Sequence, residues 1–227
     1  MPHPYARDEM TTEKTFIIGD IHGCLDMLKM LMDKIAWSPD KDRLIFLGDY
    51  IDRGEDPKGV VDYILGLIRQ SSRVECLKGN HEAMLLDFLT GRDRFMFIIN
   101  GGWKTLESYG MYESEEGGSS ISNEHRAFYE SLKLYIEIED YYVVHAGFKP
   151  GLALEKQTED EMLWIRKSFV SSEFDFGKKI IFGHTPFKEP LVTANKIGLD
   201  TGAVYGNRLT CLELPSMKFH SVEASTQ

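Results

Sequence analysis

Five short apolar runs, rich in β-branched and aromatic residues, constrain the fold of this chain more than any other feature of its sequence. Each run stops abruptly at a cluster of polar residues and glycines. Runs of this length between turn signals predict buried β-strands. The five predicted strands cover residues 15–18, 43–47, 73–77, 141–144 and 179–182.

Helical patterns separate the first three predicted strands. Residues 24–35 carry apolar side chains at helical spacing between the first and second strands. Before the third strand, Asp56 is a favourable N-cap, Pro57 suits a first helical turn, and apolar residues recur at helical spacing up to Ile68. The alternation of strand and helix predicts βαβ units and therefore an α/β fold.

The stretch from about residue 82 to residue 133 is predicted to be a helical insert that could cap the strand ends. It holds predicted helices at 82–89, 103–109 and 124–133, and an acidic loop rich in Gly and Ser at 113–123. Further strands are predicted at 134–139, 191–193, 196–199, 209–214 and 218–222. Because no repeat or linker divides the sequence, we expect a flexible N-terminal segment, 1–14, and a single domain, 15–227.

The composition excludes several classes of protein. A chain of 227 residues with 42% apolar and 27% charged residues can bury the core of an ordinary globular protein. Its net charge of −10 disfavours a nucleic-acid binder, which needs a basic face. No apolar stretch suits a signal peptide or a membrane span, so we expect a cytoplasmic protein without a membrane partner. The cysteines form no metal-type pair and are expected to be free thiols: Cys24, Cys76 and Cys211.

Side chains that bind divalent metals follow the predicted strands. Asp20 and His22 come after the first strand and stand two residues apart, so both can project to the same side. Asp49 follows the second strand, and its two oxygens could bridge two ions. The other three strands are followed by Asn80, His145 and His184. Because α/β sheets bind ligands outside the carboxyl ends of their strands, these residues are expected to form one site for Mn, Fe or Zn.

The blocks around these residues resemble the signature of the phosphoprotein phosphatase family of metallophosphoesterases. They are Gly-Asp-Ile-His-Gly at 19–23, Gly-Asp-Tyr-Ile-Asp-Arg-Gly at 48–54, Gly-Asn-His-Glu at 79–82, His-Ala-Gly at 145–147 and Gly-His-Thr at 183–185. Their order and spacing are similar to the family's, and the size resembles bacterial and phage members such as bacteriophage lambda phosphatase. The resemblance implies a calcineurin-like fold, a sandwich of mixed β-sheets flanked by helices, with a dimetal site at the strand ends.

The resemblance also implies a set of metal ligands and a cofactor. One ion would be held by Asp20, His22 and Asp49, and the other by Asp49, Asn80, His145 and His184. Bacterial members imply two Mn²⁺ ions, with Fe or Zn as alternatives. A hydroxide that bridges the two metals would attack the phosphorus directly, without a phosphoenzyme.

The remaining roles concern the substrate. By resemblance, Arg53, Arg166 and Asn80 would bind the substrate phosphate. His81 would give a proton to the departing oxygen, and Asp52 would orient His81 and keep it charged. The plainer alternatives are that Asp52 pairs with Arg53 or caps a turn, and that Arg166 is an exposed helix residue.

The favoured function is that of a metal-dependent phosphomonoesterase, a serine/threonine protein phosphatase acting on a phosphoprotein or a small phosphoester. Symmetrical diadenosine tetraphosphatases look similar and share a stretch like residues 198–203, so they are the alternative. A catalytically silent metal-binding regulatory module is the alternative of another class. Asp200 and Tyr205 lie near the substrate by resemblance, and a β-turn explains them equally well. Three histidines are expected on the surface: His3, His125 and His220.

Overall fold

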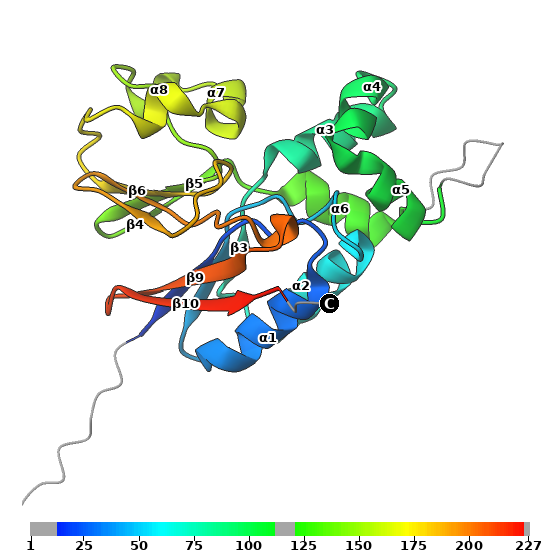
Figure 1. The fold of residues 1–227 in the computed structure, drawn as a ribbon, viewed down its shortest axis with the longest axis horizontal. Helices are drawn as coiled ribbons and strands as arrows, with labels where there is room; N and C mark the ends of the chain where they lie inside the picture. Colours follow the sequence, from blue (N-terminus) through cyan, green and yellow to red (C-terminus); the bar gives the residue numbers. More distant parts are fainter. Residues whose placement is uncertain (1–12, 112–120, 225–227) are drawn as a thin grey trace, which may run out of the picture.

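The computed structural model describes residues 13–111 and 121–224, which form a sandwich of two five-stranded mixed β-sheets (Figure 1). The first sheet has the order β10–β9–β1–β2–β3, and its β1, β2 and β3 run parallel. This parallel trio, connected by helices, confirms the predicted βαβ units. The strands are β1 Thr15–Ile18, β2 Arg43–Phe46, β3 Val74–Cys76, β9 Arg208–Leu214 and β10 Lys218–Glu223.

The second sheet has the order β4–β5–β6–β8–β7. Its three central strands are parallel, and the two edge strands are antiparallel to their neighbours. All ten described strands fall on predicted runs, with shifts of one residue at some ends. The strands are β4 Tyr135–Ile138, β5 Tyr141–Val144, β6 Lys179–Phe182, β7 Leu191–Val192 and β8 Lys196–Gly198.

Alternation along each strand divides its side chains between two apolar layers. In β1, Ile17 packs in the layer between the sheets, whereas Phe16 and Ile18 belong to the layer under two helices, α1 Leu25–Ile35 and α2 Pro57–Gln70. Figure 1 shows both helices on the outer side of the first sheet. Both were predicted, because their apolar residues recur with the helical period.

Two short helices lie on the outer face of the second sheet. They are α7 Glu159–Trp164 and α8 Lys167–Val170 (Figure 1). Phe169 packs against Phe182 of β6, with ring centroids 5.1 Å apart. Neither helix was predicted, because four to six residues are too few to display a 3.6-residue period. With helices on both outer faces, the expected sandwich of mixed sheets flanked by helices is confirmed.

The insert is helical, as predicted. The three predicted helices are present as α3 Asn80–Leu89, α5 Trp103–Ser108 and α6 Asn123–Ser131. Two elements between them were not predicted, α4 Arg94–Phe97 and a π-helical segment η1 Ile98–Gly102. Of the predicted loop at 113–123, residues 113–120 lie outside the described residues, and Ser122 caps α6.

Two histidines expected on the surface are buried, so that expectation is wrong for both. His125 is 4% exposed, and its Nε2 lies 2.9 Å from Asp62 Oδ1 of α2. His220 is 8% exposed, and its Nε2 lies 2.8 Å from Glu213 Oε2 on the neighbouring strand. In each case an acid from another element satisfies the ring, which the local sequence does not reveal. His3 lies outside the described residues.

The remaining elements are two short 3₁₀ turns, η2 Leu154–Lys156 and η3 Ala203–Tyr205. Residues 1–12 of the predicted N-terminal segment lie outside the described residues, and the single-domain organisation stays a prediction. Within residues 13–111 and 121–224, no helix combines the length and the apolar character needed to cross a bilayer.

The N-cap of α2 gives a first testable prediction. The Asp56 side chain accepts a hydrogen bond from the backbone N–H of Gly59 at 2.8 Å, as the sequence predicted. Asp56→Ala leaves that N–H without its partner and should lower the free energy of unfolding by about 1 kcal/mol. Urea unfolding measures the change. The exposed α6 substitution Glu130→Ala serves as control, and an equal loss in both variants would contradict the capping role.

Candidate metal centre

The predicted site residues come together where strands of both sheets end. Residues after β1, β2 and β3 of the first sheet meet residues after β5 and β6 of the second. Eight of the polar side chains gathered there are buried. They are Asp20, His22, Asp49, Asp52, Asn80, His81, His145 and His184.

The backbone at these strand ends is unusual, because five predicted site residues adopt left-handed conformations. Non-glycine residues rarely do so, and such strain persists only where the surrounding structure imposes it. These five are among only seven such non-glycine residues that the structure describes, so the strain is concentrated at the site. They are His22 (φ 46°), Asp49 (φ 52°), Asp52 (φ 70°), Arg53 (φ 65°) and His184 (φ 62°).

Two glycines allow loops to pack directly against the acids. A Cβ atom on Gly79 would lie 2.1 Å from Asp49 Oδ1, and one on Gly183 would lie 2.0 Å from Asp20 Oδ1. Real Cβ atoms do not approach oxygen so closely, and neither glycine could be replaced without displacing the acid. The glycines of these motifs are therefore needed for the close approach of backbone to the site.

Asp49 lies at the centre of the cluster. Its Oδ2 is 3.4 Å from His22 Nε2 and its Oδ1 is 3.5 Å from His145 Nε2, so its two oxygens face two different histidines. Two groups of side chains are close enough to hold a metal ion, and Asp49 belongs to both. The groups are His22, Asp49 and His81, and Asp49, His145 and His184. This arrangement matches a carboxylate that serves two neighbouring cations.

Three of the buried histidines, His22, His145 and His184, present neutral rings to the cluster. Nδ1 of His22 donates to Ile51 O, and Nδ1 of His145 donates to Leu47 O, each at 2.9 Å, which leaves Nε2 as the acceptor in both rings. Burial lowers the pKa of His22 to about 3. Burial, followed by the neighbouring His145, lowers the pKa of His184 to about 2. Neutral imidazoles are the form that binds metals.

Unpartnered polar atoms in the cluster test whether a metal ion fits. Among the described residues, Asp20 Oδ1 and His184 Nε2 are buried without a hydrogen-bond partner. Nε2 of His145 and Oδ1 of Asn80, both able to accept, lie 3.1 Å apart. Buried polar groups are normally satisfied, so orphaned acceptors that converge on one point fit divalent cations. Nitrogen and carboxylate oxygen donors suit Mn, Fe or Zn.

Acidic groups at this site repel one another. Burial raises the pKa of Asp20 well above its usual range, and the nearby Asp200 and Asp49 raise it further. Burial also raises the pKa of Asp200 to about 6. Asp200 Oδ1 accepts a hydrogen bond from Gly202 N at 2.9 Å, so the turn interpretation and the position near the site both hold for this residue. Bound cations would relieve the repulsion.

His81 points to Asp52 rather than outward. Its Nδ1 donates to Asp52 Oδ2 at 2.5 Å, and the other carboxylate oxygen accepts from the Thr105 hydroxyl at 2.5 Å. Thr105, on α5 of the insert, is fully buried and was not singled out in the sequence. Burial lowers the pKa of His81, but Asp49 and Asp52 more than offset this and raise it above its usual value. The alternative pairing of Asp52 with Arg53 is not what the structure describes.

The two predicted arginines differ in their surroundings. Arg53 is half-buried, its Nη1 lies 2.8 Å from His22 Nε2, and its guanidinium lies 5.7 Å from the ring centroid of Tyr205. Arg166 is exposed and is the N-cap residue of α8, so it is not a residue of a helix interior. Its charge lowers the pKa of His184, a minor effect beside burial, which indicates that it lies near the cluster.

Glu82 has a larger part in the site than its sequence position suggested. In the sequence it is only the first residue of the predicted helix at 82–89, yet it is fully buried and its carboxylate accepts three backbone hydrogen bonds. The donors are the N–H groups of Asp49, Tyr50 and Gly79, each at 2.9 Å. Glu82 thereby fastens the loop after β2 to the loop after β3. Only the folded structure brings these three N–H groups together.

This fastening predicts a double effect of Glu82→Gln. The amide NH₂ faces at least one backbone N–H, which should lower the free energy of unfolding by about 1–3 kcal/mol and let Asp49 shift. Urea unfolding should show the loss, and calorimetric titration should show weaker binding of Mn²⁺. Glu161→Gln, at the same N3 position of the capping box of α7, is the matched control and should retain Mn²⁺ affinity. Equal Mn²⁺ affinity in all three proteins would contradict the role of Glu82.

Comparison with known proteins places this arrangement in a family. Residues 14–211 match the calcineurin-like phosphoesterase family. The chain is 30% identical to a bis(5′-nucleosyl)-tetraphosphatase PrpE [asymmetrical] of Bacillus thuringiensis (strain Al Hakam), covering 92% of this chain and 94% of that protein. A solved structure described as a candidate diadenosine tetraphosphatase has a TM-score of 0.74 at 24% identity, with 96% of each chain covered. A serine/threonine phosphatase structure from Saccharomyces cerevisiae has a TM-score of 0.64 at 17% identity, covering 97% of this chain and 82% of that one. The chain therefore belongs to the calcineurin-like phosphoesterase family.

Proposed function

We propose that this protein is a hydrolase that uses two divalent metal ions, most suitably Mn²⁺, to cleave a bis(5′-nucleosyl) tetraphosphate. The observation that carries the reaction class is the position of Asp49 between two groups of buried histidines, each able to hold a cation. Two cations a few ångströms apart can clamp the attacking and leaving oxygens of an in-line displacement at phosphorus. The orphaned acceptors of Asp20 and His184 support the same conclusion.

The proposed ligands follow these two groups, except that Asp20 replaces His81 in the first, because His81 is bonded to Asp52. Asp20, His22 and Asp49 hold one ion, and Asp49, Asn80, His145 and His184 hold the other. The ions supply Lewis acidity that polarises the phosphate and lowers the pKa of water. Arg53, Arg166 and Asn80 bind the non-bridging oxygens, because guanidinium groups and amides can donate to the charge that develops there. The position of Arg53 beside His22 supports its role in this set.

His81 is proposed to be the proton donor to the departing oxygen. Asp52 fixes the Nδ1 side of the ring, so the Nε2 side is the one available to substrate. Thr105 in turn fixes Asp52 through two hydrogen bonds, one from its hydroxyl and one accepted from the Asp52 backbone N–H at 3.0 Å. The raised pKa of His81, to which Asp49 and Asp52 contribute against burial, favours the charged form that an acid requires.

The choice of substrate follows from the named relatives. The tetraphosphatases of the Bacillus species align with nearly the whole chain at about 30% identity. A tetraphosphate bridge has one central and two outer anhydride bonds. Asymmetrical cleavage of an outer bond gives a nucleoside triphosphate and a monophosphate, whereas symmetrical cleavage of the central bond gives two diphosphates. The relatives' names include the word "asymmetrical". This favours cleavage of an outer bond over the symmetrical cleavage that the sequence left as the alternative.

The serine/threonine protein phosphatase activity favoured by the sequence is kept as a second candidate. The observation in its favour is the buried proton donor itself. A phosphate leaves readily as an anion, whereas a serine alkoxide is a far stronger base and leaves only if it is protonated. The hydrogen-bonded series of His81, Asp52 and Thr105 is therefore more necessary for the hydrolysis of an ester than for the hydrolysis of an anhydride.

A substrate panel tests the proposal. Metal-stripped protein, with and without added Mn²⁺, is assayed with diadenosine tetraphosphate, a phosphoserine peptide and p-nitrophenyl phosphate, and the nucleotides are separated by chromatography. We expect Mn²⁺-dependent formation of ATP and AMP. Asp49→Asn should abolish it, because each cation loses its shared carboxylate.

Each of the other possible outcomes would indicate a different function. Formation of two ADP would establish the symmetrical reaction, and faster turnover of the phosphopeptide would establish the protein phosphatase. Inactivity toward all three substrates with Mn, Fe and Zn would favour the metal-binding regulatory module.

A separate prediction concerns the proposed proton donor, His81, and the residues that support it. His81→Asn should lower kcat at least about 100-fold for the phosphoserine peptide or an alkyl phosphate, with metal content unchanged, since His81 is not a proposed ligand. Thr105→Val, which removes the hydroxyl but keeps the volume, should lower kcat about tenfold for the same substrates. Both losses should be smaller with p-nitrophenyl phosphate, whose leaving group needs little protonation.

Thr105→Ser separates this role from a structural one, because it restores the hydroxyl and should restore most of kcat for the poor leaving groups. Steady-state kinetics and metal analysis supply the readouts. Equal losses for good and poor leaving groups, or loss of metal from His81→Asn, would refute the assignment.

A further inference from the structure

A groove lies between one face of α3 and one face of α7, next to the metal centre. Its cavity of about 410 Å³ falls in the range of sites that hold small molecules. In Figure 1, the two helices face each other. Helix α7 comes from the second half of the chain, and α3 lies at the start of the insert. Its lining includes Lys78, Ala83, Asp87, Arg92, Asp160 and Trp164.

Trp164 marks the end of the groove that adjoins the metal centre. Its indole is 36% exposed and packs edge to face against the imidazole of His184, with centroids 6.2 Å apart. Arg166 stands two residues later, between α7 and α8, so the same short segment carries an aromatic side chain and a cation. On the opposite wall, Lys78 stands two residues before Asn80. One end of the groove therefore adjoins the place where the phosphates are proposed to bind.

The charges along the groove suit an uncharged group better than a second phosphate. Lys78 Nζ lies 3.0 Å from Glu159 Oε1, and Arg92 Nη2 lies 2.8 Å from Asp87 Oδ1, so both cations are paired with acids. Asp160 adds a further carboxylate to the lining. Carboxylates accept hydrogen bonds from sugar hydroxyls, as acids do in nucleotide-binding folds, but repel phosphate. The apolar walls come from the aliphatic residues of the two helices.

We infer that the groove between α3 and α7 binds a nucleoside of the substrate, with its base stacked on Trp164 and its ribose hydroxyls against the acidic side chains. This inference rests on the proposed function and names the part of the site that selects a nucleotide over other phosphoesters. A phosphate attached to the nucleoside then extends past Lys78 toward Arg166 and the metal ligands.

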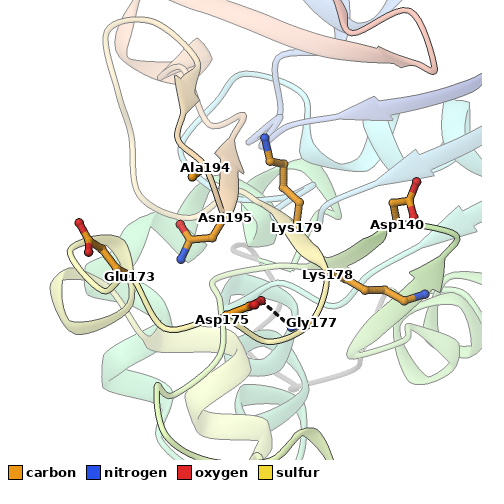
Figure 2. Close-up of a pocket in the computed structure, with 8 residues that line it drawn as sticks. All are labelled: Asp140, Glu173, Asp175, Gly177, Lys178, Lys179, Ala194 and Asn195. Carbon is orange, nitrogen blue, oxygen red and sulfur yellow. Dashed lines mark hydrogen bonds between the residues drawn. The ribbon is translucent and has the colours of Figure 1, made fainter.

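Another cavity of the same size serves as a comparison. Figure 2 shows this second pocket, also about 410 Å³, at the start of β6 and so at the opposite end of that strand from His184. Asp140, Glu173, Asp175, Lys178 and Lys179 contribute its charges, and no residue of its lining is aromatic. This second pocket has the same volume but lacks a stacking surface and does not adjoin the candidate metal centre. We therefore do not expect it to bind a nucleoside.

Fluorescence tests the inference without requiring turnover. The chain has three tryptophans, so the double substitution Trp37→Phe with Trp103→Phe leaves Trp164 as the sole indole. Adenosine, which carries no phosphate, should quench this protein saturably. It should not quench the matched protein that keeps only Trp103, which is similarly exposed at 43% but lies on α5. Absence of saturable quenching of Trp164, or equal quenching of Trp103, would overturn the inference.

Kinetics gives a second, independent readout. Trp164→Leu should raise the KM for diadenosine tetraphosphate about tenfold relative to the KM for p-nitrophenyl phosphate, the usual size of a lost base stack. Ala83→Phe, which narrows the groove from the side of α3, should also raise the ratio of the KM for diadenosine tetraphosphate to the KM for p-nitrophenyl phosphate. Ser168→Phe fills a neighbouring hollow on the other side of Trp164 and should leave the ratio as it is. A ratio unchanged by both groove substitutions would overturn the inference.

The two tests also separate this inference from the proposed function. If diadenosine tetraphosphate is not hydrolysed, the proposed function fails, and the adenosine titration alone decides whether the groove binds a nucleoside. If the tetraphosphate is hydrolysed but neither readout depends on Trp164, the function stands and the groove is not the nucleoside site.

Discussion

The site depends on holding one carboxylate, that of Asp49, between histidines that come from opposite sheets. His22 follows β1 of the first sheet and His145 follows β5 of the second, and each faces a different oxygen of Asp49. The three backbone hydrogen bonds accepted by Glu82 hold the loop that carries Asp49. The packing between the two sheets therefore has to be correct before the cluster can exist.

Much of this could be predicted from the sequence because the signals are local. Strands such as β1 and β6 are short apolar runs that end at Gly-Asp or Gly-His, and the helix after Asp56 carries its own cap and period. The six predicted ligands lie at strand ends, and the topology of parallel strands brings such ends together. Their roles stay proposals, whereas their convergence is described by the structure.

The rest could not be predicted, because it depends on contacts between residues far apart in the chain. Thr105 bonds to Asp52 across 53 positions, and Glu82 bonds to Asp49 across 33. Nothing near either residue distinguishes it from an ordinary helix threonine or a helix-start acid. His125 shows the same limit, since its partner Asp62 lies on another helix. Short helices such as α7, which brings Trp164 to the site, could not be predicted for a different reason. They are too short to show a helical period in the sequence.

The position of β1 has a consequence for how the molecule is made. This strand lies inside its sheet, with β2 on one side and β9 on the other, and Thr15 pairs with Leu214 near the far end of the chain. During synthesis on the ribosome, one edge of β1 lacks its partner until the residues of β9 have emerged. Such long-range pairing is slow to form and leaves strand edges open to association with other chains. Completion of the first sheet is therefore a late step, and chains still being made are the form of this protein most exposed to aggregation.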